Sequence, residues 1–243
     1  MVIKTKAIVL RSLKYGDASL IVDMLTEALG RVSFMVRIPK TTKAKVKKQL
    51  FQAMNILEVE FDYRVRVSIQ RLKDVRLAIA YSDIIINPMK MSVLFFLSEF
   101  LTHVTRDEQE NRPLFNYVVN SLQWYDAQEH GVANFHLVFM MRLSKFVGFF
   151  PNLTDYTQRA YFDLRNGCFV SSAPLHGDFL NETDAEHMLL MMRMDYDNMH
   201  LFRLSRAERN RFTELAMRYY RLHVPTMPDV QSLDVLQSLF VDE

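Results

Sequence analysis

The first 75 residues alternate between apolar and polar positions, which is the two-residue period of β-strands. This pattern predicts strands over 4–13, 19–26 and 31–38. The turns between them are "YGD" at 15–17 and "ALG" at 28–30, where Gly30 is expected at positive φ. Two more strands are predicted over 51–61 and 64–72, joined by a turn at Asp62–Tyr63.

Five short strands with little helix indicate a small closed barrel of the oligonucleotide-binding (OB) type. In the fifth predicted strand, alternation places Val65, Val67 and Ile69 inside the barrel. The same alternation places Arg64 and Arg66 on the outside.

The period changes near Val75, where three- and four-residue spacings typical of helices begin. A short linking helix is predicted over 76–85, and Asn87-Pro88 ends it. A hairpin of about 150–176 turns at Asn166-Gly167, and Ser205 with Glu208 fits a capping box. The other expected helices lie at 89–104, 113–128, 132–148, 183–194, 205–223 and 229–240.

The predicted fold class is therefore α+β, with an OB-fold domain over 1–80 and a helical domain over 81–243. The charge balance changes at the same place. Residues 1–80 hold sixteen Lys and Arg against seven Asp and Glu, whereas residues 81–243 hold fourteen against twenty-one. A basic module joined to an acidic one points to a polyanionic partner for the first.

The segment 37–50, "RIPKTTKAKVKKQL", carries six basic residues and no acid. Such a run is either a solvated loop or a site for nucleic-acid phosphates; beside a barrel of this type the second reading is favoured. Further basic residues of the barrel join the candidate set. The predicted nucleic-acid-binding residues, which become DNA-binding residues under the family resemblance described below, are Arg11, Lys14, Arg31, Arg37, Lys40, Lys43, Lys45, Lys47, Lys48, Arg64 and Arg66.

Four aromatic residues lie near these basic positions and could stack on bases. Tyr15 and Tyr63, in predicted turns, are candidates for stacking. Phe34 and Phe51 are expected in the barrel core instead.

The residues from Ala7 to Phe61, "AIVLRSLKYGDASLIVDMLTEALGRVSFMVRIPKTTKAKVKKQLFQAMNILEVEF", resemble the N-terminal domain of the RecO family. At lower density, "FVGFFPNL" at 146–153 and "YYRLHV" at 219–224 resemble later parts of the family pattern. The resemblance implies an OB-fold followed by a helical domain. It also implies binding to single- and double-stranded DNA, strand annealing, contact with the single-strand DNA-binding protein, and work with RecR in loading RecA.

One feature departs from many members of that family, which carry a CxxC…CxxC zinc module after the helix matching 132–148. This chain has only Cys168 there, and one thiolate cannot supply a four-ligand zinc site. A metal-free hairpin, no metal and no cofactor are therefore expected. The single cysteine also excludes an intramolecular disulfide.

Two regions of the helical part are candidates for partner binding. Arg142 and Lys145, beside Phe146 and Phe149, could hold the acidic, apolar tail of the single-strand DNA-binding protein. The helix 205–223 carries a further set of arginines that form either a second DNA surface or pairs on an exposed helix face; they are Arg206, Arg209, Arg211, Arg218 and Arg221.

No catalytic motif is present, whether a nucleophile elbow, a phosphate-binding glycine loop or a zinc-protease helix. The acids Asp184, Glu186, Asp195 and Asp197 are expected to be solvated. The longest apolar segment, at Met91, is too short to cross a bilayer. These absences predict a cytoplasmic, non-enzymatic protein, and the family resemblance implies a nucleoid-associated mediator of recombinational repair. The alternative is an RNA-binding or protein-docking OB-fold scaffold.

Overall fold

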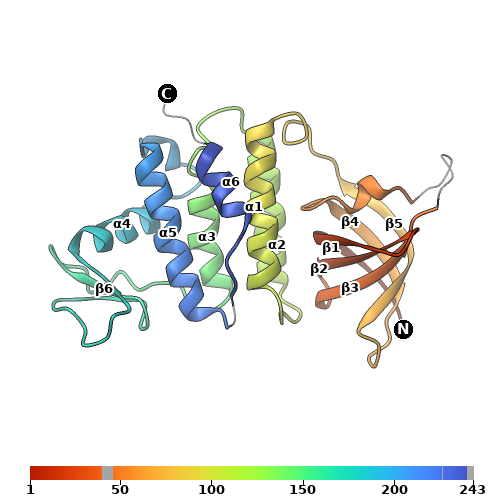
Figure 1. The fold of residues 1–243 in the computed structure, drawn as a ribbon, viewed down its shortest axis with the longest axis horizontal. Coiled ribbons are helices and arrows are strands. Elements are labelled where there is room, and N and C mark those ends of the chain that lie inside the picture. The colour runs from red at the N-terminus through yellow and green to blue at the C-terminus, as the bar shows by residue number, and fades with distance from the viewer. Residues whose placement is uncertain (40–45, 226, 240–243) are drawn as a thin grey trace. The chain divides into compact units, whose positions relative to one another are not determined.

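A computed structural model describes residues 1–39, 46–225 and 227–239 (Figure 1). They form two compact units, Met1–Ala127 and Gln128–Glu243. Helices α1 (Pro88–Val104) and α2 (Arg112–Ala127) fall within the first unit, together with the strands that precede them. The expected boundary between two domains near residue 80 stays a prediction.

The first unit begins with a closed five-stranded barrel, as predicted. The strand order around the barrel is β1-β2-β3-β5-β4, and β3 and β5 are parallel. The strands are β1 (Val2–Tyr15), β2 (Ser19–Thr26), β3 (Gly30–Arg37), β4 (Ile56–Asp62) and β5 (Ile69–Ile79). A short 3-10 helix, η1 (Lys48–Phe51), precedes β4.

Alternate side chains of each strand fill the barrel, as the two-residue period requires. Phe34 and Phe61 are fully buried and meet edge to face with ring centroids 4.9 Å apart. Phe51 is 2% exposed, so the core positions expected for Phe34 and Phe51 are confirmed. Gly30 has a φ of 69°, as expected for the β2–β3 turn.

Three expectations about β4, β5 and the segment that follows them are wrong. The helix predicted over 76–85 is absent, since β5 continues to Ile79 and turns follow it. The fifth strand begins at Ile69, so Arg64–Val67 form a turn, and Val65 and Val67 are 83% and 42% exposed. Strand β4 also starts at Ile56 rather than near residue 51.

Helix α1 packs against the outside of the barrel and is held there by polar contacts. Asn87 caps its first turn by accepting hydrogen bonds from the Met89 and Lys90 amides, ahead of Pro88. Ser98 of α1 donates a hydrogen bond to the Leu10 carbonyl of β1. In the first turn of α1, the buried Lys90 ammonium lies 2.7 Å from the Tyr125 carbonyl of α2.

The second unit is mainly helical, as predicted. It contains α3 (Phe135–Phe146), α4 (Glu182–Arg193), α5 (Arg206–His223), α6 (Ser232–Leu239) and a short 3-10 helix, η2 (Met199–Leu201). The capping box of Ser205 and Glu208 is confirmed.

The predicted hairpin of the second unit is confirmed and gains a third strand. Strands β6 (Tyr161–Asp163) and β7 (Cys168–Val170) pair around the Gly167 turn, and β8 (Phe179–Leu180) adds to β6.

Candidate nucleic-acid interface

One end of the barrel, where β1 turns into β2 and β3 ends, gathers exposed basic side chains. The strand register places Tyr15 opposite Ser19, and Ser19 opposite Arg37. The Ile38 amide donates to the Ala18 carbonyl at 2.7 Å and closes this end. Lys14, Tyr15 and Arg37 are all exposed, so β1 and β3 bring two cations and an aromatic ring to one edge.

Lys47 and Lys48 join the same edge through η1. The Ser12 hydroxyl of β1 donates to the Phe51 carbonyl at 2.6 Å and ties the end of η1 to the barrel. A hollow of about 280 Å³ lies between Ser12, Leu20, Lys48 and Phe51. Lys40, Lys43 and Lys45 lie outside the described residues. We call Lys14, Tyr15, Arg37, Lys47 and Lys48 the connector end.

The cations of the connector end have no acidic partner within 1–39 and 46–127. No ion pair or side-chain hydrogen bond occupies Lys14, Arg37, Lys47 or Lys48 in those ranges. Four uncompensated positive charges at one edge form a surface of the kind that attracts polyanions, which release condensed counterions where cations bind their phosphates.

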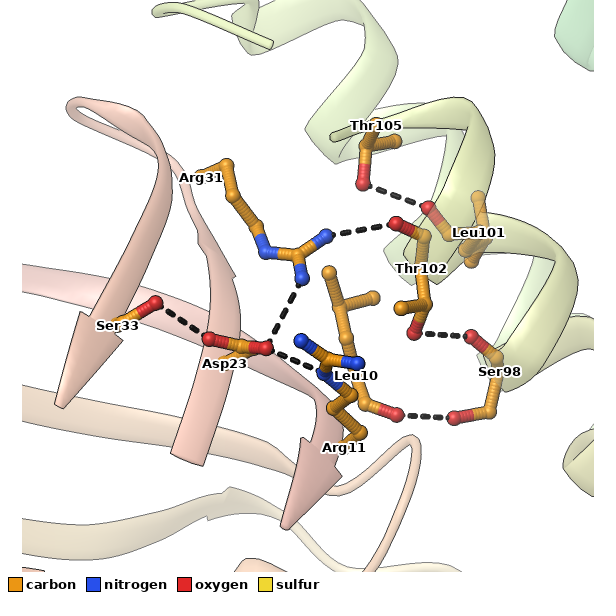
Figure 2. A network of polar contacts seen from close by, with 9 residues as sticks. All are labelled: Leu10, Arg11, Asp23, Arg31, Ser33, Ser98, Leu101, Thr102 and Thr105. Atoms are coloured by element: carbon orange, nitrogen blue, oxygen red, sulfur yellow. Dashed lines mark hydrogen bonds and ion pairs between the residues drawn. The ribbon is translucent and has the colours of Figure 1, made fainter. Parts of the chain in front are cut away.

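Arg11 and Arg31 have different surroundings, because both hold the carboxylate of Asp23 (Figure 2). Arg11 Nε lies 2.5 Å and Arg31 Nη2 3.0 Å from Asp23 Oδ2. The second nitrogen of Arg31, Nη1, donates to the Thr102 carbonyl of α1 at 2.8 Å. The Arg31 side chain is only 12% exposed, so its charge serves the junction between barrel and helix.

The pKa of the Asp23 carboxyl reflects these neighbours. Burial alone would raise it, but hydrogen bonds from Ser33 and Arg11 and the charges of Arg31 and Arg11 outweigh burial. The pKa is therefore held below its usual value, and the carboxylate stays charged beside the two guanidinium groups.

Arg64 and Arg66 lie at the opposite end of the barrel from the connector end. They belong to the turn before β5, and the Tyr63 amide next to them donates to the Met1 carbonyl at the start of β1. Both arginines are exposed. The predicted set of basic residues is thus divided between two ends of one barrel.

The two tyrosines predicted to stack on bases also differ. Tyr15 is 57% exposed at the connector end and is free to meet a base. Tyr63 is partly buried against the barrel core and meets Phe61 edge to face, with the two ring centroids 6.5 Å apart.

The arginines of α5 make contacts within the second unit. Arg211 pairs with Asp184, and Arg221 lies 2.8 Å from Asp229. Arg206 and Arg218 donate to the Gln237 and Gly177 carbonyls at 3.1 and 2.9 Å. Arg209 is buried and donates to the Asn134 side chain. These contacts indicate that the arginines of α5 form internal pairs, and they argue against a second DNA-binding surface on this helix.

The predicted tail-binding residues Arg142 and Lys145 are exposed on α3. Arg142 lies 3.8 Å from Asp195, and Phe149 stacks on His223 and meets Tyr220 edge to face. The ring of Phe149 is therefore engaged in packing.

The remaining features of the chain that bear on function are its possible metal ligands, its apolar helices and its single thiol. No group of three or more His, Cys, Asp or Glu placed to hold a metal ion occurs in the part of the chain that the structure describes. Nor is any helix there long and apolar enough to cross a membrane. Burial and the charges of Asp163 and Asp155 raise the pKa of Cys168, which suits a packing role for it.

Comparison with known proteins finds matches along nearly the whole chain. The family model for the recombination protein O N terminal matches residues 1–81, and that for the recombination protein O C terminal matches 87–230. Curated relatives, each called DNA repair protein RecO, include those of Phocaeicola vulgatus and Bacteroides fragilis, both 46% identical over 99% of this chain and 100% of the relative. The Flavobacterium psychrophilum protein is 31% identical over the same shares.

Proposed function

Because this chain belongs to the recombination protein O (RecO) family of DNA repair proteins, we propose that it serves DNA repair as a DNA-binding recombination mediator without catalytic activity. The observation that carries the proposal is the connector end, where Lys14, Arg37, Lys47 and Lys48 lie together without acidic partners.

These cations bind the phosphates of single- and double-stranded DNA. Each phosphate that is neutralised releases condensed counterions, so binding is independent of sequence and weakens as salt rises. Tyr15 adds a stacking surface for an unpaired base, worth about 1–3 kcal/mol. Backbone contacts of this kind position a strand without reading its bases.

The mediator role follows from holding strands whose charges are screened. Two strands neutralised on the protein repel each other less, which favours annealing. In line with the family resemblance, the proposed partners are RecR and the single-strand DNA-binding protein, with RecA loaded onto strands that the latter covers. Exposed Arg142 and Lys145 of α3 remain the proposed contact for that protein's acidic tail, supported by their charge.

The test is the salt dependence of single-stranded DNA binding by the full chain. Replacing Lys14, Lys47 and Lys48 together with Ala removes three phosphate contacts. The slope of log affinity against log salt should then fall by about 2, since each contact on a single strand contributes about 0.7. Fluorescence anisotropy with a labelled oligothymidylate across a salt series measures it.

A matched control removes the same charge elsewhere on the barrel. Lys4, Lys73 and Arg76 pair with Glu60, Asp62 and Glu58, so their triple Ala variant should change the slope by less than about 0.5. If both triple variants lowered the salt slope equally, the effect would come from net charge alone, and the connector end would not be the binding site. Equal competition by single-stranded RNA would favour an RNA-binding scaffold instead.

A further inference from the structure

Arg71 is a further basic residue of the barrel, and it lies in β5, outside the connector end. The parallel register of β3 and β5 places it opposite Met35, two residues before Arg37. Arg71 is exposed, between the inward-facing residues Gln70 and Leu72. It has no acidic partner among residues 1–39 and 46–127. We call the boundary between β3 and β5 the β3–β5 seam. Along it, Arg71 and then Arg37 supply positive charge that no acidic side chain of the described ranges compensates.

The face on the other side of β5 is compensated in charge. Lys4 lies 3.1 Å from Glu60, and Lys73 lies 3.0 Å from Asp62. Arg76 donates to Glu58 at 2.6 Å, and Lys6 stands opposite Glu58 in the register of β1 and β4. A phosphate bound on this face would have to break ion pairs and meet their carboxylates. The β1–β4–β5 face is therefore a poor path for DNA.

The face of β2 and β3 is partly closed. OB-folds commonly bind single strands on this face. Here Asp23 is 4% exposed and Leu25 2%, and the Arg31 side chain is turned to the Thr102 carbonyl of α1. A carboxylate at the centre of the face and a helix over it leave the β3–β5 seam as the accessible boundary of β3.

The far end of the seam is a turn of fixed shape. The Gln70 side chain is 3% exposed and binds the turn in three places. Its Oε1 accepts from the Arg64 amide at 3.1 Å, and its Nε2 donates to the Arg64 and Val67 carbonyls at 3.0 and 2.5 Å. The turn presents Arg64 and Arg66 to solvent, and neither has an acidic partner in the described parts of the first unit.

We propose that single-stranded DNA lies along the β3–β5 seam, from the turn at Arg64–Val67 past Arg71 to Arg37 and the connector end. Arg71 binds a phosphate at the middle of this path, and Gln70 is a positioning residue for Arg64 and Arg66. β3 pairs with β5 over Ser33–Met35, and the stretch of β3 from Ser33 on to Arg37 is about 13 Å long at 3.3 Å per residue. With the turn and the connector end added, the path suits the lower part of the range of about 4–16 nucleotides seen for OB-folds. This inference rests on the proposed function.

Arg71 and Lys73 give a matched pair for the test, because both are exposed cations on β5 and only Lys73 is ion-paired. For the full chain and labelled oligothymidylate, Arg71→Ala should lower the salt slope by about 0.7. Lys73→Ala should lower it by less than about 0.2. An unchanged slope for Arg71→Ala, or equal losses in the two variants, would overturn the path.

The role of Gln70 is tested through non-additivity. Arg64→Ala with Arg66→Ala should lower the slope by about 1.4. Gln70→Ala keeps every charge and should also lower it, but it should cause no further loss once both arginines are Ala. A Gln70→Ala loss that persists in the double-Ala background would show a general structural effect and refute positioning. Thermal unfolding confirms that each variant is folded.

Failure of the path and failure of the proposed function give different results. If the triple variant of Lys14, Lys47 and Lys48 flattens the slope while Arg71→Ala does not, DNA binds at the connector end and the seam is excluded. If neither changes the slope, the barrel does not bind DNA in this way and both proposals fall.

Discussion

The two turns that flank β2 have opposite surroundings. Gly16, in the β1–β2 turn, and Gly30, at the β2–β3 turn, both adopt positive φ, at 64° and 69°. A Cβ on Gly16 would meet nothing within 4 Å, whereas a Cβ on Gly30 would lie 2.2 Å from the Gln109 carbonyl oxygen. The first turn is open, and the second is packed against the chain that follows α1.

The charges near the two turns follow the same division. Arg31, beside Gly30, holds Asp23 and the Thr102 carbonyl, and its amide donates to the Glu108 carbonyl at 2.9 Å. Arg37, at the other end of the same strand, is exposed and near the open turn. The arginine at one end of β3 is thus used in internal contacts, whereas the arginine at the other end is exposed to solvent. Position in the fold, rather than residue type, decides which arginine can bind a phosphate.

The largest expected effect separates the two glycines. Gly30→Ala places a methyl group against backbone atoms at a left-handed position, and it should lower the free energy of unfolding by about 4 kcal/mol. Gly16→Ala meets only the backbone strain, about 1 kcal/mol. Urea unfolding followed by circular dichroism measures both. Similar losses would contradict the comparison between a packed and an open turn.

Removing Asp23 should have the next largest effect on stability. Asp23→Ala leaves the Arg31 guanidinium buried without its carboxylate, which should cost about 3 kcal/mol. Asp62→Ala is the control, because its pair with Lys73 is nearly half exposed and is worth no more than about 0.5 kcal/mol. If the two variants unfold at the same urea concentration, the ion pairs at the junction are no stronger than those on the surface.

Acid should weaken the junction through Asp23. Its pKa in the folded protein lies below the ordinary value of 3.8, so its stabilisation is complete above that value and is lost as the pH falls through the folded pKa. The free energy of unfolding of the native protein should therefore fall more steeply in acid than that of Asp23→Asn. Urea titrations between about pH 6 and pH 3 compare them. Parallel curves would remove Asp23 from the acid response.

Much of the fold could be predicted because its elements depend on local pattern. Strands β2 and β3 and the helices α1, α2 and α5 lie within a residue or two of their expected ranges. The stretch 64–72 was misread because "RVRVSI" alternates like a strand. Its first residues are instead held in a turn by the side chain of Gln70, and no periodicity in the sequence reports such a contact.

The candidate site was predictable only as a concentration of charge. The run at 37–50 identified the connector end, but Arg31 was indistinguishable from Arg37 in the sequence. The partner of Arg31 at Thr102 is 71 residues away, so only the tertiary structure shows its role. Arg71 was missed for the converse reason. It lies in a strand of mixed charge, and only the structure shows that β5 pairs with β3 at this residue and that Asp62 pairs with Lys73 instead.

The smallest effects come from exchanging Arg for Lys at the two ends of β3, and they isolate geometry from charge. Arg31 uses two nitrogens in a forked arrangement, toward Asp23 and toward the Thr102 carbonyl. A lysine ammonium reaches only one of them, so Arg31→Lys should cost about 1.5 kcal/mol of stability and leave the salt slope of DNA binding unchanged. Arg37→Lys keeps the one property that a phosphate contact needs and should change neither quantity, although Arg37→Ala should lower the slope by about 0.7. If Arg31→Ala lowered the slope as much as Arg37→Ala does, DNA would lie over the junction and the assignment of the two arginines would be reversed. We expect no such loss, because a cation enclosed by Asp23 and α1 cannot reach a phosphate without giving up the contacts that bury it.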